Sequence, residues 1–462
     1  METKQPQTPP AEARENIMGT MEINPLLVKL SVPMMISMLV QALYNVVDSV
    51  FVSHVSENAL TAVSLAFSLQ NVMIAVGVGT GVGVNAMLSK SLGEKNQRRA
   101  NATAENGIFL SLCSFVVFLV IGLTCMKPYF YAQTGDEAIA RQGIQYLSVC
   151  CIFSLGLFTQ TMGEKLLAAT GRTYLSMISQ LTGAVVNIIL DPILIFALNM
   201  GVRGAATATV ISQAVGAVWV LRFLTGSRTR LRLSVKNMPL VGKVIGPCLG
   251  LGVSTFVMIA TESILSISFN SSLARYGGDI AVGAMTIITS ATQLLSMPVQ
   301  GLCQGAQPIM SFNFGAGKGD RVKRAFRLQF VICVGYAVAF WAACMLVPQM
   351  FASVFSTDPE LVQYTAWAMR VYMAGIFSTG FQASCQQSFV ALGQAKISLF
   401  MACLRKLILL IPLIFILPLI LQDKVFAVFL AEPVSDIIAA TVTCSAFFIR
   451  FNKILATSQK KA

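Results

Sequence analysis

Twelve long apolar segments account for most of this chain and constrain its fold more than any other feature. A helix that crosses the hydrocarbon core of a bilayer needs about 20 mostly apolar residues, and twelve stretches of the sequence meet that criterion. We therefore expect twelve membrane-spanning helices, at residues 26–52, 59–89, 107–126, 139–163, 174–198, 204–223, 244–270, 280–311, 328–347, 361–388, 397–421 and 425–449.

The composition leaves no room for a separate soluble domain. Hydrophobic residues make up 55% of the chain and charged residues 11%, whereas about 25% of an ordinary soluble protein is charged. The N-terminal segment 1–25 is polar and lacks the apolar middle of a cleaved signal peptide. The predicted fold class is an all-α polytopic membrane protein.

The positions of the basic residues indicate how the chain is oriented. The net charge is +13, and Lys and Arg fall almost entirely in alternate loops and at the two termini. Basic loops stay in the cytoplasm, so we expect a multi-pass protein of the cytoplasmic (inner) membrane with both termini cytoplasmic. The basic residues form no aromatic-interleaved surface, so nucleic acid is not an expected partner.

Metal-based and histidine-based chemistry have almost no residues to use. The chain has one histidine, His54, and its 11 cysteines lie in apolar stretches without metal-type spacing. We expect no metal site, no cofactor and no enzymatic activity. The glycine-rich run at residues 77–83 lies inside an apolar helix and follows no strand, so it predicts close helix packing and no ATP site.

The two halves of the chain are related by an internal repeat. Gly93 and Gly315 follow the second and eighth apolar segments. Gly171 and Gly393 follow the fourth and tenth segments, and the spacing in residue number is the same for both pairs. Each half has an even number of spans, so the halves are parallel and related by a pseudo-twofold axis along the membrane normal.

This repeat predicts how the chain is divided. We expect two six-helix lobes joined by a basic connection, with the substrate path between them. The predicted parts are a polar cytoplasmic N-terminus 1–25, an N-terminal lobe 26–223, a cytoplasmic linker 224–243, a C-terminal lobe 244–450 and a cytoplasmic tail 451–462.

Four motifs resemble the multidrug and toxic compound extrusion (MATE) family, most closely its bacterial MepA-like and NorM-like members. They are Pro33 followed by residues 41–48 (QALYNVVD), the loop 93–99, residues 187–192 (NIILDP) and residues 201–209 (GVRGAATAT). The resemblance covers nearly the whole chain. It implies the V-shaped, two-lobe MATE fold and a secondary active multidrug antiporter. Such a protein exports cationic amphipathic compounds in exchange for H⁺ or Na⁺ by alternating access of its lobes.

Two carboxylates lie inside apolar helices of the first half. A charge in hydrocarbon costs roughly 2.5 to 3.5 kcal/mol even on lenient scales, so such residues are functional candidates. At a rise of about 1.5 Å per residue, Asp48 and Asp191 reach a similar depth, and Asn187 is one turn before Asp191. Thr209 reaches a similar level from the other side. The resemblance implies that these four residues form the ion-coupling site; the alternative is that they only hold neighbouring helices together.

The polar residues around Asp48 are the expected substrate contacts. Gln41, Tyr44 and Asn45 flank Asp48 on the first helix. Pro192 follows Asp191 directly and, because it lacks an N–H, it permits a kink in the fifth helix. Two carboxylates close together in a low dielectric titrate as a coupled pair, so protonation can be coupled to binding or to such bending.

The second half offers a rival ion site. Glu262 matches Asp48 in the repeat, and Glu432 and Asp436 lie one turn apart in the last helix. These three acids are secondary ion or pathway candidates.

The site of the first half is nevertheless not duplicated. Leu409 and Leu413 stand where the first half has Asn187 and Asp191. NorM-like members have a further acid in the tenth helix, where this chain offers glutamines. That departure puts a complete sodium site in this lobe in doubt; the glutamines are Gln382, Gln386 and Gln387.

Two charged pairs near helix ends have a simpler interpretation. Glu164 and Lys165 lie near the inner end of the fourth helix, and Arg405 and Lys406 near the cytoplasmic end of the eleventh. Long charged side chains reach the headgroup region while their stems stay in apolar surroundings. We therefore expect these residues to be anchors at the interface.

Three other functions fit the sequence less well. A lipid or lipid-linked precursor flippase on a related two-lobe scaffold is the nearest alternative, but it favours a strongly basic central cavity. A membrane-embedded enzyme needs clustered histidines or a metal motif, and a channel needs a symmetric filter ring. The expected partners are small cationic drugs and the lipid bilayer, and the expected working unit is a monomer.

Overall fold

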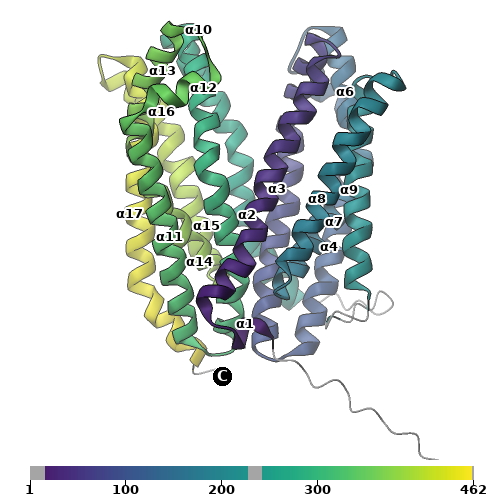
Figure 1. Ribbon diagram of the computed structural model, residues 1–462, viewed down its shortest axis with the longest axis vertical. Coiled ribbons are helices and arrows are strands. Elements are labelled where there is room, and N and C mark those ends of the chain that lie inside the picture. Colours follow the sequence, from purple (N-terminus) through teal and green to yellow (C-terminus); the bar gives the residue numbers. More distant parts are fainter. Residues whose placement is uncertain (1–15, 227–230, 232–241, 460–462) are drawn as a thin grey trace, which may run out of the picture.

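The computed structural model describes residues 16–226, 231 and 242–459, and almost all of them are helical. Figure 1 shows two groups of helices that meet at the end where α1 (Ile17–Thr20) lies and diverge toward the opposite end. We call these the closed end and the open end. Most of the predicted linker 224–243 lies outside the described residues.

The first group of helices, the N-lobe, follows the chain from α2 to α9. Polar side chains fix several of its helix starts; Ser56, for example, accepts a hydrogen bond from the N–H of Ala59. Its elements are α2 (Ile23–Ser53), α3 (Glu57–Gly93), α4 (Gln97–Thr124), α5 (Met126–Tyr131), α6 (Glu137–Ile152), α7 (Leu155–Ala169), α8 (Thr173–Pro192), the π-helix η1 (Ile193–Ala197) and α9 (Val202–Leu224).

The second group, the C-lobe, contains the remaining helices and their short non-α segments. Its elements are α10 (Gly242–Gly315), α11 (Gly319–Leu346), α12 (Pro348–Phe355), α13 (Pro359–Tyr372), the 3₁₀ turn η3 (Met373–Gly375), α14 (Ser378–Ala391), α15 (Ala395–Cys403), the π-helix η4 (Leu404–Leu410), α16 (Ile411–Ile420) and α17 (Lys424–Gln459).

The helices agree closely with the predicted membrane crossings. Nine helices of the described residues are long and apolar enough to span a membrane, or ten if α6 and α7, bent by 49°, form one span. The 74 residues of α10 are two helices joined at Gly278, where φ is 67°, so α10 supplies two crossings. Within the described residues, the predicted span 361–388 is the one that does not form a helix long and apolar enough to meet this criterion. The structure forms it as α13 and α14.

The internal repeat is visible in equivalent contacts. Gly171 and Gly393 follow α7 and α14 with φ of +80° and +75°, a left-handed conformation that favours glycine at a helix C-terminus. The hydroxyl of Ser89 donates to the Ala169 carbonyl at 3.2 Å. The hydroxyl of Ser311, its counterpart in the second half, donates to the Ala391 carbonyl at 2.8 Å. The two halves are therefore built alike, as the fold class predicts.

Glycines let the two lobes approach closely at the closed end. A Cβ atom added to Gly83 of α3 would overlap the Cys248 carbonyl of α10, and one added to Gly93 would overlap the Phe312 carbonyl. In the repeat-related contact, a Cβ atom on Gly305 of α10 would overlap Ser31 of α2. The glycine-rich run thus permits close helix packing, as predicted from its sequence.

Candidate functional site

The polar residues predicted to couple ions lie where α2, α8 and α9 pack against one another. Asp48 comes from α2, Asn187 and Asp191 from α8, and Thr209 from α9. The side chains of Asn187 and Asp191 are fully buried, and Thr209 is 2% exposed. The four residues are therefore held by three different helices inside the N-lobe.

The two carboxylates of this cluster interact directly with each other. Asp48 and Asp191 lie within hydrogen-bonding reach, and the Asn187 amide donates to Asp191 Oδ1 at 3.4 Å. Two ionised carboxylates are acceptors only, so a hydrogen bond between them requires a proton on one of the two. The arrangement is suited to holding an exchangeable proton.

Several oxygen atoms of the cluster lack partners. Asp48 Oδ1, Asp191 Oδ2 and Thr209 Oγ1 are buried without a hydrogen bond, and so is Asn187 Oδ1. Buried polar atoms in native proteins are nearly always paired. The unpaired oxygens of Asp48, Asn187 and Asp191, which interact with one another, therefore indicate a site for a proton, a cation or water. No hydrogen bond within the described residues joins Thr209 to the two carboxylates.

The chain breaks its α-helical pattern next to this cluster. Pro192 ends α8 one residue after Asp191, and the π-helix η1 begins at Ile193. Proline removes one backbone donor, and π-helical turns are frequent at functional sites. The local geometry around Asp191 thus follows from the sequence.

Two tyrosines lie close to the carboxylates. Tyr44 of α2 interacts electrostatically with both Asp48 and Asp191, and Tyr146 of α6 interacts with Asp48 and Tyr44. Tyr146 is 1% exposed. Sequence reasoning named Tyr44 but missed Tyr146, because nothing in the pattern of the third and fourth helices connects that residue with Asp48.

The remaining predicted substrate contacts have different surroundings. Gln41 accepts a hydrogen bond from the Gln180 amide of α8 at 3.0 Å, which fixes it between two helices. Asn45 is exposed. Of the three residues, Asn45 is thus the most accessible to a bound compound.

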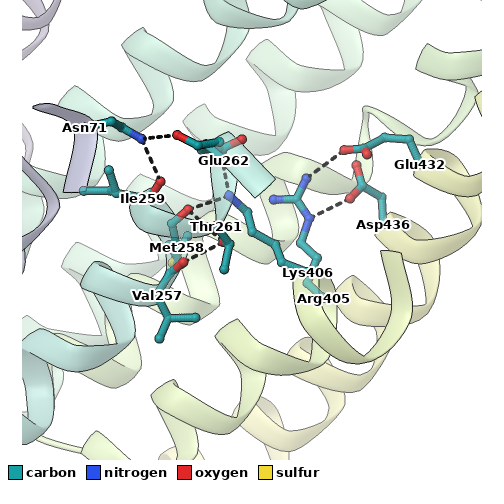
Figure 2. A network of polar contacts seen from close by, with 11 residues as sticks. Asn71, Val257, Met258, Ile259, Thr261, Glu262, Arg405, Lys406, Glu432 and Asp436 are labelled. Carbon is teal, nitrogen blue, oxygen red and sulfur yellow. Dashed lines mark hydrogen bonds and ion pairs between the residues drawn. The ribbon is translucent and has the colours of Figure 1, made fainter. Parts of the chain in front are cut away.

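The acids of the C-lobe are paired with cations. Figure 2 shows the Arg405 guanidinium between Glu432 and Asp436, with Nε at 2.6 Å from Asp436 Oδ1 and Nη2 at 3.4 Å from Glu432 Oε1. The adjacent Lys406 points the other way, toward Glu262, with which it forms an ion pair, and its ammonium also donates to the Met258 carbonyl at 2.6 Å. The three secondary candidates thus belong to one charged network.

The prediction that Arg405 and Lys406 are interfacial anchors is wrong. Lys406 is 4% exposed, and both side chains point to carboxylates of other helices. The sequence shows only that the two cations lie well inside the helical run that begins with α15 at Ala395. A buried cation needs a partner, and these partners lie on α10 and α17, far away in sequence.

The anchor interpretation of Lys165 is also wrong. Lys165 is 9% exposed, and its ammonium donates to Gln304 Oε1 of the C-lobe at 2.5 Å. Its neighbour Glu164 accepts a hydrogen bond from Gln160 at 3.1 Å. Lys165 is therefore a contact between the lobes, and its ammonium does not reach the surface.

The glutamines that replace an acid in the tenth helix are structural partners. Gln386 donates to Ser398 at 2.7 Å, and Gln387 donates to Gln307 at 3.0 Å. Gln382 is 5% exposed, and its Oε1 has no partner. These neutral side chains add no charge to the C-lobe.

Comparison with known proteins agrees with the motifs. The MatE family model matches residues 33–193 and again residues 255–416, so each half of the chain matches it separately. The starts of the two matches are separated by the same spacing as the repeated glycines. The same model thus describes both lobes.

Two relatives are similar over almost their full length. The multidrug export protein MepA of Staphylococcus haemolyticus is 26% identical over 422 residues, which cover 90% of this chain and 92% of that protein. The multidrug export protein MepA of Staphylococcus aureus (strain NCTC 8325 / PS 47) is 24% identical over 417 residues, covering 89% and 91%.

Solved structures show the same fold. A MATE crystal structure in the bent conformation superposes with a TM-score of 0.90 at 23% identity, covering 96% of this chain and 99% of that one. An outward-facing MATE family multidrug resistance transporter of the MOP superfamily gives 0.89 at 23% identity, covering 96% and 98%. The two matches to the family model cover well over half of the chain. The chain therefore belongs to the MatE family, the multidrug and toxic compound extrusion transporters, which are not enzymes.

Proposed function

We propose that this protein is a secondary active antiporter that exports cationic amphipathic compounds in exchange for protons. It works as a single chain in the cytoplasmic membrane, with both termini and the closed end on the cytoplasmic side. The lobes at residues 26–223 and 244–450 separate at one end while they meet at the other. The substrate path between them is then open to one side at a time.

The observation that carries this proposal is the set of unpaired, buried oxygens around Asp48 and Asp191. The cluster lacks a basic partner among the described residues in contact with it, yet its two carboxylates touch. A proton relieves this repulsion and completes a hydrogen bond between them. Loss of that proton leaves negative charge in a low dielectric, which a cationic substrate neutralises. The two ligands therefore compete, as an exchanger requires.

The C-lobe supports protons over sodium as the coupled ion. A sodium-driven mechanism would use Glu262, Glu432 and Asp436, but Arg405 and Lys406 already pair with these acids. Among the described residues, the N-lobe cluster is where touching carboxylates lack such a partner. We therefore assign coupling to Asp48, Asn187, Asp191 and Thr209.

The substrate class follows from charge and accessibility. Both relatives compared above are named multidrug export proteins, and the two carboxylates favour a cation. Tyr44 supplies an aromatic ring beside them, a surface to which organic cations are attracted. We assign substrate binding to Gln41, Tyr44 and Asn45, the residues that flank Asp48.

Helix α8 is the element that links the site to lobe motion. Asp191, which holds the proton, precedes Pro192 and the π-helix η1. A change of charge at Asp191 alters its contacts with α2, and the weakened backbone pattern lets the end of α8 move in response. Binding and release of a proton thereby shift the balance between the two lobe arrangements.

Reconstituted protein tests the proposal. Liposomes that contain the full chain receive a fluorescent cationic dye and either a pH gradient or a sodium gradient. We expect dye transport under the pH gradient alone. Asp191→Asn should abolish drug-dependent proton movement, whereas Asp279→Asn, which changes an exposed aspartate, should leave it intact.

Each outcome has a definite meaning. Transport driven by sodium alone would move the assignment to the C-lobe acids. Coupled transport that is unchanged in Asp191→Asn would overturn the N-lobe mechanism. A protein that moves the dye under neither gradient is not an ion-coupled drug antiporter, and movement of a fluorescent lipid would then favour the flippase alternative.

A further inference from the structure

The two partners of the Lys406–Glu262 ion pair differ in their exposure to solvent. The Lys406 side chain is 5% exposed, whereas the Glu262 side chain is 63% exposed. The Lys406 ammonium has a second partner in the Met258 carbonyl at 2.6 Å, one helical turn before Glu262. The buried ammonium thus contacts both Met258 and Glu262 (Figure 2), whereas most of the Glu262 side chain remains accessible.

Glu262 lies beside the boundary between the lobes. The next residue, Ser263, accepts a hydrogen bond from Asn71 of α3 at 3.3 Å, and the same amide donates to the Ile259 carbonyl at 3.2 Å. Figure 2 shows Asn71 next to Glu262. Because α3 belongs to the N-lobe and Glu262 to the C-lobe, the exposed carboxylate stands where the two lobes meet.

The local backbone separates the two neighbouring cations. Arg405 and Lys406 lie in the π-helix η4. Arg405 forms ion pairs with Glu432 and Asp436, whereas the ion pair of Lys406 is with Glu262. The ion pairs are therefore divided between the two cations, and Lys406 is the cation that contacts Glu262 within the described residues.

The ligands around the Lys406 ammonium are those that an exchangeable cation would use. A carboxylate and a backbone carbonyl are oxygen donors of the kind that bind protonated amines and alkali ions. The ammonium reaches them from a covalently attached side chain, at a high effective concentration. Any free cation that approaches Glu262 must compete with it.

We propose that Lys406 is a tethered competitor for Glu262, which a cationic substrate must displace from that carboxylate. The displaced ammonium keeps its hydrogen bond to the Met258 carbonyl. The lysine thereby sets a threshold that admits cations able to pair strongly with Glu262 and rejects weakly binding ones such as hydrated sodium. The proposal rests on the proposed function, since it takes the space between the lobes to be the path of cationic substrates.

The proposed role predicts that removal of the Lys406 charge increases the affinity for substrate. A lysine that only supports the fold would weaken substrate binding when it is removed. A competitor would strengthen binding when it is removed, because Glu262 is then left unpaired and negative. The expected gain is about tenfold in Kd, equivalent to about 1.4 kcal/mol.

Calorimetric titration of the purified full chain with tetraphenylphosphonium, a monovalent organic cation, measures this gain. Lys406→Gln keeps a donor for the Met258 carbonyl without the charge, and Lys406→Met removes both. We expect both variants to bind the probe about tenfold more tightly than the unchanged protein. Lys165→Gln removes the charge of another buried lysine, which contacts Gln304 instead, and should leave Kd unchanged.

Glu262→Gln tests whether the gain in probe affinity comes from release of Glu262 or from the general loss of a positive charge. It should weaken probe binding, and the double variant Lys406→Gln/Glu262→Gln should bind as weakly as Glu262→Gln alone. Sodium should also compete with the probe in Lys406→Gln and not in the unchanged protein.

Two results would overturn the proposal. The first is equal or weaker binding in a folded Lys406→Gln protein, as judged by its thermal midpoint. The second is a gain that persists in the double variant. Transport of the same probe under a pH gradient is measured separately: transport without a gain in Lys406→Gln overturns the tethered competitor alone, and no transport overturns the proposed function.

Discussion

The two lobes hold acidic residues in comparable places but neutralise them differently. In the N-lobe, Asp48 and Asp191 interact with each other and leave buried oxygens unpaired. In the C-lobe, Arg405 and Lys406 supply a cation to every one of the three acids. In the proposed mechanism, the N-lobe site takes a proton or a cation from solution, whereas the acids of the C-lobe network are paired with its own cations.

The repeat explains where this difference arises. Arg405 and Lys406 stand where the first half has Gly183 and Ala184, and Leu413 stands in the place of Asp191. The second half has thus gained two cations and lost one acid on the helix that carries the N-lobe site. The contacts at the closed end, by contrast, are retained in both halves. Packing at the closed end is therefore more alike in the two halves than the charge inside each lobe.

The largest effect on stability should come from Arg405→Ala. This change leaves Glu432 and Asp436 buried without their cation, and breaking a buried ion pair costs about 3 to 5 kcal/mol. The free energy of unfolding, measured by titration with a denaturing detergent, should fall by that amount. Arg203→Ala, at an exposed arginine, is the matched control, and an equal loss in both variants would refute the paired network.

Gly83→Ala should cause a slightly smaller loss of stability. It tests the close packing at the closed end, which both halves of the chain share. The added methyl group would overlap the Cys248 carbonyl, and overpacking costs about 1 to 3 kcal/mol. The repeat-related Gly305→Ala should behave in the same way. Gly335→Ala places its Cβ where no other atom lies within 4 Å and should not lower the thermal midpoint. A midpoint that is unchanged in Gly83→Ala would contradict the close contact.

Neutralising one acid in each lobe should change the thermal midpoint differently. Asp436→Asn weakens a hydrogen bond to a charged partner, worth about 1.5 to 3 kcal/mol, and should lower the thermal midpoint. Asp191→Asn removes a charge from a pair of touching carboxylates and should leave the midpoint unchanged or raise it. Equal shifts of the thermal midpoint in the two variants would contradict the claim that the two lobes neutralise their acids differently.

The smallest expected effect is that of Asn71→Ala. It removes two hydrogen bonds between α3 and α10, each worth about 1 kcal/mol or less in a partly exposed place. The thermal midpoint should fall slightly, and probe affinity at Glu262 should change little. A large loss of affinity would instead make Asn71 part of the binding site.

Much of the fold was predictable because its determinants are local in the sequence. The apolar runs locate the crossings, although α4, α11 and α17 extend well beyond the predicted bounds. Gly171 and Gly393 mark helix ends that need left-handed backbone. Asp48 and Asp191 were predicted to share a depth because helical rise converts residue number into height. Each of these inferences depends on the sequence of a single helix.

Contacts between helices were not predictable in the same way. The anchor interpretation of Arg405 and Lys406 fails because their acidic partners lie on other helices, α17 and α10, and no sequence periodicity indicates which helices pack together. Tyr146 was missed for the same reason. One signal was available: two cations inside an apolar run require partners, and Glu262, Glu432 and Asp436 were the unassigned acids.

Proton release on substrate binding tests the central claim most directly. A weakly buffered solution of the purified full chain receives tetraphenylphosphonium, and a pH indicator records protons released per molecule bound. We predict release by the unchanged protein and by Asp436→Asn, and none by Asp191→Asn. Release that persists in Asp191→Asn and disappears in Asp436→Asn would contradict the account, because the C-lobe would then be the lobe that exchanges protons.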